Sequence, residues 1–141
     1  MYRTAIEKLV EWKQNKHRKP LIIKGARQVG KTWLMKEFCR QAYADTVYIN
    51  FDSNSGIAEL FASDLDTERL IMGLELYVGH KINPENSLLI FDEIQEVPRA
   101  LASLKYFYEN APQYHIVCAS SLLGITLYQG TSFPVGKVDF L

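Results

Sequence analysis

The chain has 141 residues, of which 48% are hydrophobic, and its 16 Lys and Arg residues balance its 16 Asp and Glu residues. This length and composition are typical of one globular domain, and the zero net charge gives no electrostatic argument for nucleic-acid or membrane binding. No segment resembles a signal peptide or a transmembrane helix, so we expect a cytoplasmic protein. Cys39 and Cys118 lack a metal-ligand spacing, and we expect both to be buried and inert.

Helices and strands are expected to alternate along the chain. In chain order they are a short amphipathic helix within residues 2–17, a strand at 21–24, a helix from 31 to about 42, a strand at 46–51, helices at 57–62 and 67–78, a strand at 88–91, a helix at 98–110, a strand at 115–119 and a fifth strand pattern at 133–141. Pro20 is expected to end the first helix. Apolar strands between helices predict a parallel sheet covered by helices. The fifth strand pattern stops without a turn or a polar tail, and we interpret it as truncated.

A glycine-rich loop lies between the first predicted strand and the helix that follows it. Its sequence fits the phosphate-loop pattern G-x-x-x-x-G-K-[ST], and strand and helix are the context that this pattern needs. In such loops the lysine contacts the β- and γ-phosphates and the final hydroxyl binds Mg²⁺. Arg27 is interpreted either as a solvated surface residue or as a contact to phosphate or a neighbouring subunit. The candidate nucleotide-binding residues are Gly25, Ala26, Arg27, Gln28, Val29, Gly30, Lys31, Thr32 and Trp33.

Two carboxylates follow the apolar strand at 88–91. Asp92 and Thr32 are the candidate Mg²⁺ ligands. Glu93 is a candidate catalytic base that activates water, and Lys31 is a second candidate catalytic residue. A solvated acidic turn is the structural alternative. From the residues alone we expect this strand and the phosphate-loop strand to be neighbours in the sheet.

Polar residues near the ends of two strands have two interpretations each. Ser120 and Ser121 end the strand at 115–119; Ser121 is a candidate catalytic sensor of the γ-phosphate, or one of two turn-forming serines. Gln95 either lies near the phosphates or caps the helix at 98–110.

Several longer segments carry a family resemblance. GARQVGKTWL, FDEIQEVPRALASLKYFYE, HIVCAS followed by SLLG, and FPVGKVDFL resemble the ATPase domain of bacterial and archaeal AAA-type P-loop proteins that carry a C-terminal domain of unknown function. The resemblance covers nearly the whole chain, and it implies one AAA-type domain at residues 1–141, with the C-terminal domain absent. The implied fold is an α/β three-layer sandwich of the P-loop NTPase type, with a parallel sheet in the order 5-1-4-3-2.

The resemblance also assigns roles to residues. It identifies Gly25 to Thr32 as the Walker A loop, Asp92 and Glu93 as the Walker B pair, and Ser121 as the sensor. Ser120 stands where the family usually has glycine, which raises the question of how the backbone is accommodated there.

The function that these motifs predict is hydrolysis of Mg-ATP to drive a conformational switch. A neighbouring subunit or later segment often supplies an arginine in this family, which implies a possible oligomer and little or no turnover by this chain alone. A nucleotide-binding module or truncated fragment without efficient turnover is the alternative. Glu93 and the sensor strand argue against a small-molecule kinase, and the lack of an Asn-Lys-x-Asp signature after the loop argues against a GTPase. A protein or nucleic-acid partner is not identifiable from the sequence, and no membrane partner is expected.

Overall fold

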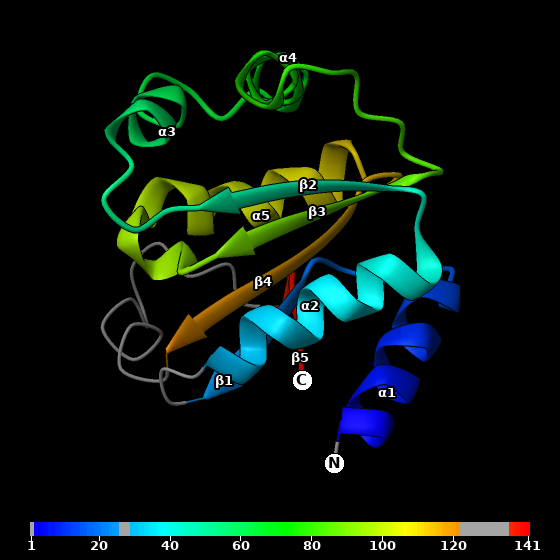
Figure 1. Cartoon of the computed structure of the whole chain (residues 1–141). Helices are drawn as coiled ribbons and strands as arrows, with labels where there is room; N and C mark the ends of the chain where they lie inside the picture. Colours follow the sequence, from blue (N-terminus) through cyan, green and yellow to red (C-terminus); the bar gives the residue numbers. More distant parts are fainter. Residues whose placement is uncertain (1, 26–28, 122–135) are drawn as a thin grey trace.

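A five-stranded parallel sheet forms the centre of the computed structural model, which describes residues 2–25, 29–121 and 136–141 (Figure 1). The elements are α1 (Tyr2–Gln14), β1 (Leu21–Gly25), α2 (Val29–Ala42), β2 (Asp45–Asn50), α3 (Ser55–Leu60), α4 (Thr67–Val78), β3 (Ser87–Asp92), the short 3₁₀ helix η1 (Ile94–Glu96), α5 (Pro98–Asn110), β4 (His115–Ser121) and β5 (Asp139–Phe140). The strand order is β2-β3-β4-β1-β5, which is the predicted order read from the other edge.

The sheet order corrects one expectation. β1 and β3 are not neighbours, because β4 lies between them and pairs in parallel with both. The phosphate-loop strand and the strand that ends in two carboxylates are therefore separated by the strand that ends in Ser120 and Ser121.

Helices cover both faces of the sheet, as the three-layer prediction requires (Figure 1). Along β1 the side chains alternate: Leu21 and Ile23 pack in the cluster formed with α1 and α2, whereas Ile22 packs in the cluster formed with α3, α4 and α5. All six residues of β3 are buried, as expected for a central parallel strand. None of the described helices has both the length and the apolar character needed to cross a membrane.

Most predicted boundaries are correct within two residues, and α4 and α5 match the predicted ranges. Asp66 caps α4 by accepting a hydrogen bond from the Arg69 backbone N–H at 3.1 Å, and Gly79 ends this helix with a φ of 85°, a conformation that favours glycine. The fifth strand is shorter than the predicted 133–141 within the described residues, and residues 133–135 lie outside them.

The first helix ends at Gln14, three residues before the predicted limit at residue 17 and well before Pro20. The guanidinium of Arg18 donates to the carbonyl oxygens of Lys13 and Asn15, at 3.5 and 3.2 Å. These contacts satisfy carbonyls that another helical turn would otherwise use, so the chain leaves the helix before the proline.

Both cysteines are buried, as predicted. Burial raises the pKa of the Cys39 thiol, and it raises the pKa of Cys118 well above its ordinary value. Both thiols are therefore held in the unreactive, protonated form.

His115, the first residue of β4, is held neutral in an aromatic cluster. Its Nδ1 lies 2.5 Å from the Tyr43 hydroxyl, and its ring packs edge-on against Tyr43 and Trp12. Burial, together with the positive charges of Arg18 and Lys13, lowers the pKa of His115 to about 4 from its ordinary value of 6.5. Burial raises the pKa of Tyr43, so both partners of this contact are neutral at pH 7, and the imidazole tautomer decides which of them donates.

We predict that folding stability falls as the pH is lowered from about 6.5 toward 4. In this window the unfolded chain takes up a proton on the imidazole of His115 and the folded chain does not, so acid favours unfolding. Because the ring is only partly buried, the loss should be on the order of 1 kcal/mol. Urea unfolding near pH 7 and near pH 5 measures this change in the free energy of unfolding.

His115→Gln should reduce the pH dependence of stability, whereas His17→Gln, at an exposed position, should not. Equal pH dependence in both variants would contradict the assignment to His115.

Candidate functional site

Residues far apart in the sequence meet where α2 begins and β3 and β4 end. The Thr32 hydroxyl donates to Asp92 Oδ2 at 2.6 Å, across 60 positions of sequence. The Lys31 ammonium donates to the backbone carbonyl oxygen of Ser120 at 3.2 Å. The carboxyl ends of parallel strands are where open α/β sheets bind ligands, so these contacts lie where the motifs predict a site.

Asp92 is the most buried charged group of this site, with only 4% of its surface exposed. A second hydroxyl, that of Tyr48 in β2, donates to the same Oδ2 atom at 2.7 Å. Burying a carboxylate requires such donors, because lost hydration must be replaced. The carboxylate of Asp92 is thus fixed between α2 and β2.

Tyr48 is a site residue that the motifs do not predict. In β2, Val47 and Ile49 pack on the α3–α5 face of the sheet, which leaves Tyr48 on the α2 face. The pairing of Asn50 with Asp92 then puts Tyr48 two residues back along the neighbouring strand. Period-two alternation shows that Tyr48 and the apolar residues lie on opposite faces, but the register between β2 and β3 is needed to bring it to Asp92.

Glu93 has an unusual backbone conformation. Its φ of 54° and ψ of 45° lie in the left-handed region. Among the described non-glycine residues, Ser53 is the only other one with a positive φ. Such a conformation costs roughly 1–3 kcal/mol and is often found at active sites. It turns the chain from β3 into η1, an element that sequence analysis did not predict.

The side chain of Gln95 holds that of Glu93. Gln95 is buried in η1, and its amide donates to Glu93 Oε1 at 2.7 Å and to Glu96 Oε2 at 3.4 Å. The N-cap of α5 is Val97, which makes no side-chain capping bond. Both interpretations of Gln95 remain predictions.

Ser120 does not need the glycine that the family usually has there. It is a buried residue of β4 and pairs with Lys24 in extended conformation, and it is not among the described residues with positive φ. Ser121 pairs with Gly25 at the end of β4. The Ser121 side chain lies outside the described part of the chain, so its sensor role remains a prediction.

The remaining candidates are placed as follows. Val29 and Gly30 begin α2, and Trp33, on the same helix, is 50% exposed. The other three candidate nucleotide-binding residues, Ala26, Arg27 and Gln28, lie outside the described residues.

Two basic residues of the described chain, Arg99 and Lys137, contact other elements of this chain. Arg99 Nε donates to the Phe61 carbonyl oxygen at 3.1 Å, and Lys137 forms an ion pair with Glu109 at 3.1 Å. Both contacts hold neighbouring elements of this chain together.

The donor set fits a magnesium ion. The Thr32 hydroxyl and the Asp92 carboxylate are hard oxygen donors, which Mg²⁺ prefers. In residues 2–25, 29–121 and 136–141 there is no cluster of three or more His, Cys, Asp or Glu side chains suited to a metal. Mg²⁺ with a nucleotide does not need one, because phosphates and water supply most of its ligands.

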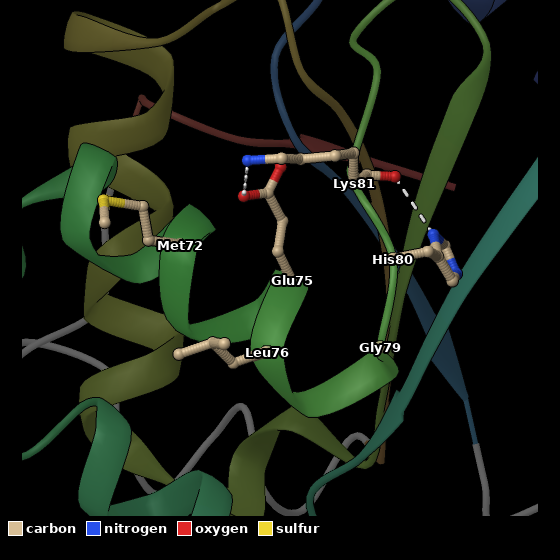
Figure 2. A pocket seen from close by; sticks show the side chains of 6 residues that line it. All are labelled: Met72, Glu75, Leu76, Gly79, His80 and Lys81. Atoms are coloured by element: carbon tan, nitrogen blue, oxygen red, sulfur yellow. Dashed lines mark hydrogen bonds and ion pairs between the residues drawn. The ribbon is translucent and has the colours of Figure 1, made fainter.

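A pocket at the end of α4 lies apart from these residues (Figure 2). It is lined by Met72, Glu75, Leu76, Gly79, His80 and Lys81. Its polar groups contact one another: Lys81 Nζ lies 3.8 Å from Glu75 Oε1, and His80 Nδ1 lies 3.0 Å from the Lys81 carbonyl oxygen. No predicted site residue lines this pocket.

One protein family, described as AAA domain, matches residues 17–141 of the chain. The chain belongs to this family of AAA-type P-loop ATPases. Family membership confirms the resemblance seen in the sequence and makes the chain an AAA-type nucleotide-binding module. A C-terminal domain and a bacterial or archaeal source remain predictions. No curated protein matches the chain.

Two solved structures resemble this AAA domain. The structure of Drosophila ORC bound to AT-rich DNA and Cdc6 has a TM-score of 0.63 at 15% identity, covering 99% of this chain and 53% of that chain. The Aeropyrum pernix ORC1 protein in complex with DNA has a TM-score of 0.54 at 17% identity, covering 99% of this chain and 43% of that chain. At these identities the likeness shows the fold alone. The AAA domain spans about half the length of each.

Proposed function

We propose that this AAA domain binds Mg-ATP at the start of α2 and hydrolyses it to drive a conformational switch. The observation that carries the proposal is the 2.6 Å hydrogen bond from Thr32 to Asp92, because it joins the end of the phosphate-loop motif to the acidic end of β3. Either motif alone has a structural alternative, whereas a direct contact between the two is the arrangement expected of a shared magnesium site.

Each residue has a distinct role in the proposed reaction. Lys31 and the backbone N–H groups at the start of α2 bind phosphate oxygens, helped by the positive end of the helix dipole. Thr32 and Asp92 hold Mg²⁺, which when bound offsets the negative charge of the phosphates. Glu93 accepts a proton from water as the water oxygen bonds to the γ-phosphorus. The bond from that phosphorus to the bridging oxygen breaks, and ADP keeps the electron pair.

Contacts in the structure suggest how nucleotide could switch the domain. The Lys31 ammonium contacts the Ser120 carbonyl oxygen, and phosphate oxygens would compete for the same ammonium. Gln95 holds Glu93 through one carboxylate oxygen, Oε1, so the orientation of the proposed base depends on the segment that follows β3. Nucleotide binding is thereby coupled to the ends of β3 and β4.

The partner of this switch is proposed as a protein or a nucleic acid. Both similar solved structures are complexes with DNA, and one also contains Cdc6, but these are partners of those proteins. A neighbouring subunit that supplies an arginine would raise turnover, by about 10³–10⁵-fold in related chemistry. We therefore expect slow hydrolysis by this chain alone.

Product analysis tests the proposal. The chain incubated with ATP and Mg²⁺ should release ADP and inorganic phosphate in equal amounts, and removal of Mg²⁺ with EDTA should stop the release. A small-molecule kinase would form ADP with less free phosphate when its acceptor is supplied. If the chain binds Mg-ATP but releases no more phosphate than the buffer alone, hydrolysis is contradicted and the alternative of a nucleotide-binding module stands.

A further inference from the structure

Two hydroxyl groups from different layers donate to one oxygen of Asp92. Thr32 reaches Oδ2 from α2 at 2.6 Å, and Tyr48 reaches the same atom from β2 at 2.7 Å. Because both bonds end on Oδ2, the second carboxylate oxygen, Oδ1, accepts from neither hydroxyl. The orientation of the carboxylate is thus set by a donor outside the phosphate loop as well as by one inside it.

The position of Tyr48 is itself well defined. β2 and β3 pair in parallel from Asp45 opposite Ser87 to Asn50 opposite Asp92. This ladder fixes the distance of Tyr48 from the end of β3. The ammonium of Lys36, one turn along α2 from Thr32, lies 4.2 Å from the centre of the Tyr48 ring. A cation over the ring face restrains the ring between the helix and the sheet.

The Tyr48 hydroxyl is a donor at neutral pH. Burial and the hydrogen bond to Asp92 raise the pKa of Tyr48 well above its ordinary value. The phenol therefore keeps its proton, and the carboxylate oxygen is the acceptor.

We propose that Tyr48 is a positioning residue that holds the Asp92 carboxylate in the orientation needed to bind Mg-ATP. This inference rests on the proposed function, because it assigns a role toward the same magnesium site. Thr32 is both a donor to Asp92 and a proposed metal ligand, so its hydroxyl serves two partners. Tyr48 comes from a strand that the phosphate-loop motif does not include, and it orients Asp92 independently of that loop.

Tyr48→Phe tests the inference, because it removes the hydroxyl and keeps the ring. Calorimetric titrations should give a dissociation constant for Mg-ATP about tenfold higher than wild type, the expected effect of one hydrogen bond to a charged group. The dissociation constant for ATP in EDTA should not change, because a metal-positioning role vanishes without the metal. A loss confined to Mg-ATP is a signature that general destabilisation would not produce.

Tyr43→Phe is the matched control, because it also removes one hydroxyl from a part-buried hydrogen bond, the contact to His115. It should leave both dissociation constants unchanged, with both variants compared at temperatures at which they are fully folded. Equal weakening of Mg-ATP binding in the two tyrosine variants, or weakening by Tyr48→Phe that persists in EDTA, would overturn the positioning role.

Asp92→Asn separates this inference from the proposed function. If Asp92→Asn weakens Mg-ATP binding but Tyr48→Phe does not, the role of Tyr48 is wrong and the magnesium site stands. If Asp92→Asn binds Mg-ATP as wild type does, the proposed magnesium site is wrong, and the role of Tyr48 fails with it.

Discussion

Glu93→Gln is expected to lower the rate of ATP hydrolysis by about 10²–10⁴-fold, the usual contribution of a general base. Glutamine has nearly the same shape but does not accept the proton that water must lose. The left-handed backbone at this position is already occupied by a non-glycine residue of the same length, so the fold should tolerate the change. Binding of Mg-ATP should remain, because the proposed phosphate and metal contacts come from Lys31, Thr32 and Asp92.

Glu96→Gln provides the control for that experiment. Glu96 is an exposed acid on η1, the 3₁₀ helix that follows Glu93, and it also accepts a hydrogen bond from Gln95, at 3.4 Å. Single-turnover assays with protein in excess over labelled ATP measure even a slow rate. We expect wild-type hydrolysis from Glu96→Gln. Equal rates for wild type and Glu93→Gln would contradict the assignment of Glu93 as the base.

The convergence of Thr32 and Asp92 was predictable, because two motifs each fix a residue at the carboxyl end of a strand. The sheet order was a different matter. Alternating apolar segments predict a parallel sheet but carry no information on which strands are neighbours, and the residues alone led to the wrong pairing of β1 with β3. The correct order came from the family resemblance.

Three details of the site depend on tertiary structure. The contact of Tyr48 with Asp92 needs the register of β2 on β3, which no local pattern specifies. The left-handed conformation of Glu93 is not predictable from the sequence, because the residue is not a glycine, and the surrounding fold has to stabilise it. The end of α1 at Gln14 depends on where the guanidinium of Arg18 lies, and local pattern alone placed this end up to three residues later, at residue 17.

Lys31→Ala is expected to remove most of the affinity for Mg-ATP. An ammonium at the start of α2 would neutralise part of the triphosphate charge, and its truncation would leave that charge without its partner. Losing one member of a hydrogen-bonded charge pair in a binding site weakens binding by roughly 30-fold or more.

Calorimetric titration of Mg-ATP into wild type, Lys31→Ala and Lys105→Ala tests the central claim, that the start of α2 is a nucleotide site. Lys105 is an exposed lysine on α5, on the opposite face of the sheet, so Lys105→Ala removes the same charge away from the site. We expect saturable binding by wild type and Lys105→Ala, and binding weakened by roughly 30-fold or more in Lys31→Ala. Equal affinities in all three proteins, or no binding by folded wild type, would contradict the claim.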